Sequence, residues 1–148
     1  MKPEREVNIL LVEDDPGDVE LVREALMESK LIVTLDVVGN GEEAMQYLRR
    51  QPPFPEAKRP DLILLDLNMP KKSGREVLKE LKEDEGLRSL PVCILTTSQA
   101  EADIAKSYYL GANCYITKPM GLEEFAHVVK SIEDFWFAIV TLPQKEER

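Results

Sequence analysis

Three carboxylates of the sequence stand directly after short apolar runs, and together they are of a type that can hold a metal ion. Glu13 and Asp14 follow the run VNILLV, and Asp66 ends the run LILLD. Two such charges about 4 Å apart repel by roughly 4 kcal/mol at an effective dielectric constant near 20, so a cluster of them needs a cation. Oxygen ligands without His or Cys favour Mg²⁺ held partly through a phosphate group. An acidic surface patch is the alternative.

Two more polar residues stand at the ends of similar runs and are candidates for binding an anion. Thr96 ends the run PVCILT, and its hydroxyl can donate a hydrogen bond to an anion. Lys118 follows the run CYIT and can supply a point charge. The alternatives are a β-branched residue that merely suits a strand and a solvated surface lysine.

The apolar runs have the length and β-branched content of strands, and amphipathic stretches separate them. The predicted strands span residues 7–12, 33–38, 62–66, 91–96 and 114–117. Helix start signals follow the first four runs, namely Asp15 before Pro16, Asn40 with Glu43, Ser73 with Glu76, and Ser98 with Glu101. The predicted helices span residues 16–29, 41–50, 74–84, 99–110 and 121–140. Strand and helix therefore alternate as (βα)5.

Strands that are apolar almost throughout require cover on both faces, which alternating helices supply. The prediction is an α/β fold with a flavodoxin-like, doubly wound parallel sheet of strand order 2-1-3-4-5 and an extended C-terminal helix. In such a sheet the ligand site lies beyond the carboxyl ends of the strands, where the order reverses between the first and third. Glu13, Asp14 and Asp66 should meet there, with Thr96 and Lys118 at the same edge.

Length, composition and charge exclude several classes of protein. A chain of 148 residues with 43% hydrophobic and 32% charged residues indicates one globular domain without a membrane-spanning stretch. The N-terminus lacks the features of a signal peptide, so we expect a cytoplasmic protein. The net charge of -9 would repel a nucleic-acid backbone. We therefore expect protein partners, and neither nucleic acid nor membrane.

Four motifs in order resemble the receiver domain of two-component response regulators over about residues 7–134. They are LVEDD, LILLDLNMP with KKSG, ILTTS and YITKP. The resemblance implies that Asp66 accepts a phosphoryl group from a phosphohistidine on a partner histidine kinase. It implies a signalling protein that assists its own Mg²⁺-dependent phosphorylation and dephosphorylation and is not otherwise an enzyme.

The same resemblance implies roles for the remaining site residues. Mg²⁺ would be bound by Asp14, Asp66 and the backbone carbonyl of Asn68, while Glu13 would hold a metal-bound water. The phosphoryl group would be contacted by Lys118, the Thr96 hydroxyl and the Thr97 backbone N–H, with Tyr115 turning inward as Thr96 moves and a cis Lys118–Pro119 bond.

The end of the sequence carries more apolar residues than one helix face can bury. Phe135, Trp136, Phe137, Ile139 and Val140 add to the core-facing stripe of the last predicted helix, which indicates an interface, so we expect a homodimer. Only QKEER follows Pro143, which predicts one receiver domain over residues 1–148 without an output domain. The motifs also resemble the stand-alone regulators paired with bacterial and cyanobacterial phytochrome kinases.

Two other functions remain as alternatives. A phosphatase with an aspartyl nucleophile also uses an aspartate at a strand end, but it commonly has a second aspartate two residues later, where this sequence has Asn68. A flavodoxin-like module that binds a small molecule is the other alternative, although no phosphate-cradling glycine loop follows the first strand.

Two further features receive no assigned function. The segment QPPFPEAKRP, residues 51–60, is either a tolerated surface loop or a partner contact made by Phe54. Cys93 and Cys114 lie in apolar strands and are expected to be small core residues, not a disulfide.

Overall fold

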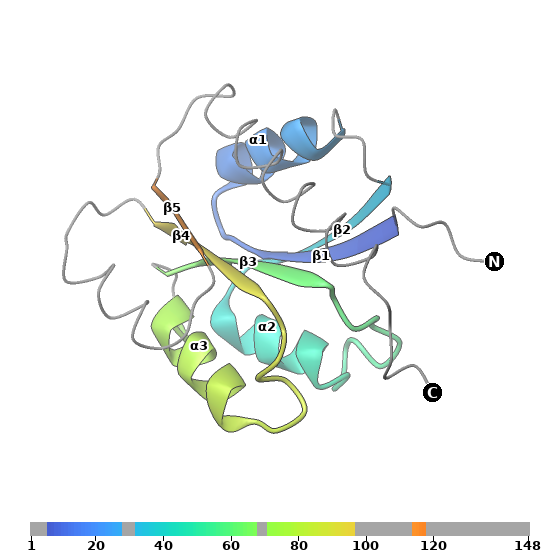
Figure 1. Ribbon diagram of the computed structural model, residues 1–148, viewed down its shortest axis with the longest axis vertical. Helices are drawn as coiled ribbons and strands as arrows, with labels where there is room; N and C mark the ends of the chain where they lie inside the picture. Colours follow the sequence, from blue (N-terminus) through green and yellow to red (C-terminus); the bar gives the residue numbers. More distant parts are fainter. Residues whose placement is uncertain (1–5, 28–31, 68–70, 97–113, 118–148) are drawn as a thin grey trace, which may run out of the picture.

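The computed structural model describes residues 6–27, 32–67, 71–96 and 114–117. Its parallel sheet has five strands in the order β2-β1-β3-β4-β5, as the sequence predicted. They are β1 (Glu6–Val12), β2 (Ile32–Val38), β3 (Leu62–Asp66), β4 (Val92–Thr96) and β5 (Cys114–Thr117). The order reverses between β1 and β3, which are hydrogen-bonded neighbours, so the switch point lies beside the central strand (Figure 1).

Among the described residues, three helices cover the two faces of this sheet. Figure 1 shows α1 (Pro16–Met27) on one face, and α2 (Gly41–Leu48) and α3 (Gly74–Glu83) on the other. In the described part of the chain, no helix has the length and apolar character needed to cross a membrane. The helices predicted at 99–110 and 121–140 lie outside the described residues.

The starts of α1 and α2 confirm the predicted signals at Asp15 and Asn40, whereas Ser98 and Glu101 lie outside the described residues. The Asp15 carboxylate accepts a hydrogen bond from the Gly17 backbone N–H at 2.8 Å. Asn40 accepts from the Glu43 N–H at 2.9 Å, while the Glu43 carboxylate accepts from Gly39 instead of completing a capping box. These bonds satisfy N–H groups that have no partner inside the helix.

At the start of α3, the predicted start signal of Ser73 with Glu76 forms a full capping box. Ser73 and Glu76 exchange side-chain and backbone hydrogen bonds. The end of α2 comes earlier than predicted, because Arg49 caps the helix and Arg50 adopts a positive φ of 56°.

The core has two parts, one on each face of the sheet. Because neighbouring side chains of a strand point to opposite faces, alternate residues of one strand join different clusters. Leu10 and Leu65 pack with α2 and α3, whereas Leu11 and Leu64 pack with α1. This burial on both faces accounts for the continuous apolar runs, and it rigidly holds the strand ends that carry the site.

Cys93 corrects one expectation. It is 1% exposed, as a core residue should be, but it is also disulfide-bonded, so the expectation against a disulfide is wrong. Cys114, the other cysteine of the chain, stands opposite Cys93 in the register of β4 and β5. Neighbouring strands lie about 4.8 Å apart, within the Cα spacing that a disulfide allows. The pairing depends on this register, which the strand patterns do not specify.

Phe54 holds the proline-rich loop, residues 51–60, against the core of the domain. The Phe54 ring lies 5.6 Å from the Tyr47 ring of α2, centroid to centroid, and packs against the core cluster. The Tyr47 hydroxyl donates a 2.5 Å hydrogen bond to the Asp36 carboxylate of β2. These contacts favour a surface loop held by the core over a partner contact made by Phe54.

Tyr47 should make the stability of the protein sensitive to alkaline pH. Burial, and then the hydrogen bond to Asp36, raises the pKa of Tyr47 above its ordinary value. In the unfolded chain the Tyr47 hydroxyl ionises near pH 10, whereas in the folded chain it keeps its proton there. The free energy of unfolding therefore has its full value below pH 10 and falls above it. The test is urea unfolding of the wild type and Tyr47→Phe at pH 8 and at pH 11. At pH 8, Tyr47→Phe should be less stable than the wild type by about 1 kcal/mol. The difference in unfolding free energy between the two proteins should be smaller at pH 11. An equal difference at both pH values would contradict the raised pKa of Tyr47.

Candidate metal and phosphate site

The site begins with two adjacent strand ends. β1 and β3 pair with Val12 opposite Leu65, so the next residues, Glu13 and Asp66, emerge side by side. The Glu13 N–H donates to the Val38 carbonyl of β2 at 3.0 Å, which continues the sheet for one more residue. Both carboxylates are therefore carried on backbone that the sheet itself holds.

The three predicted acids meet as expected. One carboxylate oxygen from each of Glu13, Asp14 and Asp66 lies within 4.8 Å of the others. Glu13 is 2% and Asp66 3% exposed, whereas Asp14 is exposed to solvent. Burial removes water that would screen the buried pair, so their mutual repulsion calls for a positive charge.

The donor set fits a hard divalent cation. Each acid offers carboxylate oxygen, and in the part of the chain that the structure describes no histidine or cysteine joins the cluster. Mg²⁺ prefers such oxygen ligands and keeps several of its waters, which the exposed side at Asp14 can accommodate. The Asp15 N–H donates to a Glu13 carboxylate oxygen at 3.2 Å and so helps to orient that side chain.

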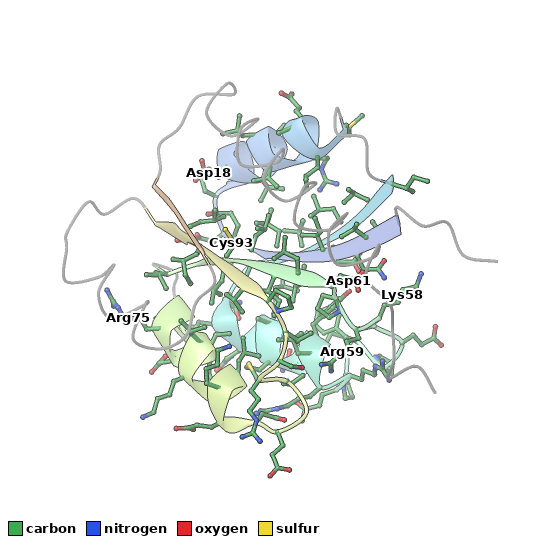
Figure 2. The ribbon with its side chains drawn as sticks, viewed as in Figure 1. Asp18, Lys58, Arg59, Asp61, Arg75 and Cys93 are labelled. Atoms are coloured by element: carbon green, nitrogen blue, oxygen red, sulfur yellow. The ribbon has the colours of Figure 1, made fainter. Side chains whose placement is uncertain are left out.

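Two nearby aspartates have structural roles instead. Asp15 caps α1. The Asp61 carboxylate accepts a hydrogen bond from the Asn8 backbone N–H at 2.8 Å. Figure 2 shows Asp61 at the opposite end of the sheet from Asp18, which lies in the first turn of α1. Asp61 therefore belongs to the amino-terminal edge of the sheet and takes no part in the cluster.

The structure describes only part of the predicted anion-binding half of the site. Thr96 is the last residue of β4 and pairs with Thr117 of β5, so both strands end at the edge that carries the acids. Tyr115 lies in β5 opposite Ile94. The remaining predicted site residues, Asn68, Thr97 and Lys118, lie outside the described residues, as do Phe135, Trp136, Phe137, Ile139 and Val140.

The sequence analysis did not identify Gly74 as a residue that positions Asp66. Gly74 packs directly against the backbone carbonyl of Asp66, and a Cβ there would overlap that carbonyl and come within 2.6 Å of the Leu67 Cα. Its N–H also donates to the Leu67 carbonyl at 3.1 Å. The available signal was a glycine directly after the N-cap Ser73, where a side chain would ordinarily be tolerated.

Comparison with known families and proteins agrees with this geometry. A family model described as the response regulator receiver domain matches residues 9–130. The response regulator Rcp1 of Synechocystis sp. is 47% identical over 135 residues, which cover 91% of this chain and 92% of that protein.

Two solved structures are similar to this chain in both fold and sequence. The crystal structure of the phosphorylated cyanobacterial phytochrome response regulator RcpA is 50% identical, with a TM-score of 0.83, and the match covers 94% of this chain and 99% of that one. The Mn²⁺-bound form of Rcp1 is 46% identical, with a TM-score of 0.81, and the match covers 93% and 99%.

Proposed function

The chain belongs to the response regulator receiver family, whose role is phosphorylation on an aspartate by a histidine kinase, and from this premise we propose that Asp66 is the phosphoacceptor. The observation that carries the assignment is the cluster itself. Asp66 ends the central strand, and its carboxylate meets those of Glu13 and Asp14 at the switch point of the sheet. Receiver regulators are signalling proteins and generally not enzymes.

The reaction asks the protein mainly for position and charge neutralisation. A carboxylate oxygen of Asp66 forms a bond to phosphorus while the bond from phosphorus to the kinase histidine breaks, and the imidazole leaves and takes up a proton. Divalent metal binding is consistent with the acidic cluster, and Mg²⁺ would neutralise charge on the transferring group. Asp14, Asp66 and the Asn68 carbonyl would hold it, and Glu13 would orient a bound water.

The second half of the site would bind the phosphoryl group on Asp66. This group adds about -1.5 to -2 charges at the end of β3. Lys118 would pair with its oxygens, the Thr96 hydroxyl and the Thr97 N–H would donate to them, and Tyr115 would turn inward. Moving these groups would shift the packing around β4 and β5, which would be the output signal.

The phosphorylation proposal is tested with a small phosphodonor. The protein incubated with acetyl phosphate and Mg²⁺ should gain the mass of one phosphoryl group on the intact chain. The group should be lost in base and in hydroxylamine, because it is an acyl phosphate. Excess EDTA should suppress the gain. Labelling that resists both base and hydroxylamine would overturn the assignment to a carboxylate.

Removing one metal ligand should weaken Mg²⁺ binding selectively. Asp14→Asn removes a charged ligand from the exposed side of the cluster, so we expect Mg²⁺ to bind about tenfold or more weakly and to raise the melting temperature less than in the wild type. Glu20→Gln is the matched control, because it removes one exposed negative charge on α1 outside the cluster. Equal Mg²⁺ affinities in both variants would exclude Asp14 as a ligand.

RcpA is a cyanobacterial phytochrome response regulator. Pairing with a histidine kinase is established for the family. We propose that the kinase partner of this chain is a phytochrome and that the pair works in the cytoplasm. The identities of 47% to 50% over more than nine tenths of the chain support this. Phosphotransfer from a purified phytochrome kinase, faster than from an unrelated histidine kinase, is the expected result.

We also propose a homodimer through the apolar end of the last predicted helix. Phe135, Trp136, Phe137, Ile139 and Val140 supply more apolar surface than one core-facing stripe can bury. Sedimentation of Phe137→Asp should therefore show a shift from dimer to monomer, because a charge would be buried in an apolar contact. A dimer that persists in this variant and in Phe135→Asp would place the interface elsewhere.

A further inference from the structure

The outer edge of β2 is a strand edge with little protection against pairing. The strand order ends at β2, and among the described strands only β1 pairs with it. β2 has seven residues, whereas β5 at the other end of the sheet has four. Proteins ordinarily protect such edges by short length, charge or proline, because alternate backbone groups point outward and can pair with another chain. β2 has no proline and one charged residue, Asp36.

A cleft borders β2 on each face of the sheet. The cleft on the α2 side, of about 480 Å³, is lined by Asp36, Val37, Tyr47 and residues 53–57 of the proline-rich loop. The cleft on the α1 side, of about 360 Å³, is lined by Arg23, Leu26, Met27, Val33 and Leu35. Successive residues of a strand point to opposite faces, so a strand added beside β2 presents alternate side chains to the two clefts.

The cleft on the α1 side is suited to apolar side chains. Its lining is apolar except for Arg23. Met27 is 78% exposed, and Ile32 at the start of β2 is 56% exposed. Covering such surface with an apolar side chain is favourable, and the flexible Met27 can adapt its shape to the side chain that it contacts.

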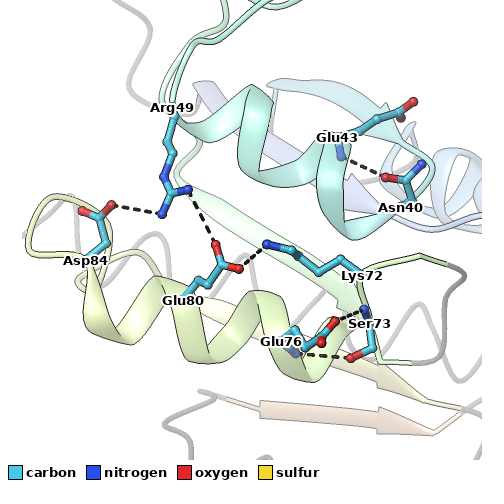
Figure 3. A network of polar contacts seen from close by, with 8 residues as sticks. All are labelled: Asn40, Glu43, Arg49, Lys72, Ser73, Glu76, Glu80 and Asp84. Atoms are coloured by element: carbon cyan, nitrogen blue, oxygen red, sulfur yellow. Dashed lines mark hydrogen bonds and ion pairs between the residues drawn. The ribbon is translucent and has the colours of Figure 1, made fainter.

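The cleft on the α2 side carries two carboxylates that lack a cation. Asp36 and Glu56 line this cleft and are exposed, and no ion pair among the described residues reaches either of them. The acids between α2 and α3 differ in this respect, since Glu80 is paired with Lys72 (Figure 3). The charge of the α2-side cleft therefore matches a cationic side chain.

We propose that the edge of β2 binds an extended, arginine-containing segment of a protein partner by strand addition. Backbone groups of β2 pair with the segment, its arginines enter the cleft of Asp36 and Glu56, and the apolar residues between them cover Met27. The Tyr47 hydroxyl donates to one Asp36 oxygen and orients that carboxylate, and a guanidinium can donate to the other oxygen. The net charge of -9 also attracts a basic segment. This surface is separate from the phosphoacceptor site.

The capped peptide RLRLR, which alternates arginine and leucine, is the probe for this surface. It is titrated into the ¹⁵N-labelled full chain near physiological ionic strength, where charges farther apart than about 8 Å are largely screened. The amide chemical shifts that change most should belong to residues 32–38. The same peptide methylated on every backbone nitrogen keeps its charge and side chains but cannot donate hydrogen bonds to a strand, so it should bind at least about tenfold more weakly. Equal affinities of the two peptides would reduce the contact to charge attraction and overturn the proposal.

Substitutions in the α2-side cleft test the arginine contact. Asp36→Asn and Glu56→Gln should each weaken binding of RLRLR by about threefold to tenfold, the scale of one hydrogen bond to a charged group. Glu83→Gln is the matched control, because it removes one exposed negative charge from α3 outside both clefts, and it should bind as the wild type does.

Three other results would contradict strand addition by a partner. They are no shift change with RLRLR, shift changes that gather outside residues 32–38, and equal affinities in Asp36→Asn, Glu56→Gln and Glu83→Gln. Shift changes of residues 32–38 on dilution of the protein alone would assign the edge to a second copy of this chain and would likewise overturn the proposal.

Discussion

Asp66→Asn is expected to remain folded and to lose phosphorylation by roughly three orders of magnitude or more, the scale seen when a nucleophile is removed. The amide oxygen is neutral and a poor nucleophile, and the mixture of donor and acceptor atoms no longer matches a cation. Asp66 is 3% exposed at the end of the central strand, and an amide of the same shape should preserve the packing there. Intact-mass spectrometry after incubation with acetyl phosphate and Mg²⁺ measures the loss.

Asp61→Asn is the control for this substitution. It makes the same chemical change at the other end of the strand β3, and its amide oxygen can still accept the hydrogen bond from the Asn8 N–H. Phosphorylation of Asp61→Asn should equal that of the wild type. A phosphoryl group that persists in Asp66→Asn would identify a different acceptor and would defeat the proposed function.

Asp66→Asn should also stabilise the metal-free protein. Removing one of three clustered charges relieves repulsion, which we expect to add about 1 kcal/mol to the free energy of unfolding after screening at the exposed side. Urea unfolding in EDTA should show the gain. Mg²⁺ should then stabilise the wild type more than Asp66→Asn, since the wild type has the larger repulsion to offset.

Gly74→Ala is expected to destabilise the fold by about 3 kcal/mol, near the upper end for overpacking. The new Cβ would overlap the Asp66 carbonyl and lie 2.6 Å from the Leu67 Cα. These obstacles are backbone atoms of the central strand, which cannot rotate away as a side chain can. Relief requires α3 to move outward, which would break the hydrogen bond from the Gly74 N–H to Leu67.

Gly86→Ala distinguishes crowding from the general effect of replacing glycine. Its Cβ would meet only the Asp84 carboxylate, at 3.4 Å, on an exposed turn. Urea unfolding should place Gly86→Ala within about 0.5 kcal/mol of the wild type, as is usual for surface changes. Equal unfolding free energies for Gly74→Ala and Gly86→Ala would show that α3 adjusts freely, contrary to the contact described.

Much of the described fold could be predicted because its signals are local. Continuous apolar runs mark strands buried on both faces, and residues such as Asp15 and Ser73 mark helix starts with their own side chains. Once strands and helices alternate, the rules of parallel sheets restrict the order and place the strand ends at one edge. That shared edge is enough to predict from the sequence that Glu13, Asp14 and Asp66 lie together.

Other features depend on contacts between distant parts of the chain. The burial of Glu13 and Asp66 beside an exposed Asp14 follows from how the sheet and helices pack around the strand ends. The disulfide of Cys93 follows from the register of two strands.

By itself, the sequence determined the strands, their order and the acidic cluster among the described residues, because hydrophobic periodicity and capping act over a few neighbouring residues. Only the tertiary structure decided that Gly74 lies against the backbone of Asp66 and Gly41 against that of Lys72. A glycine carries no side-chain signal of what it approaches. Its role becomes visible only when two elements, separated in the chain, come close enough that a single methyl group would not fit between them.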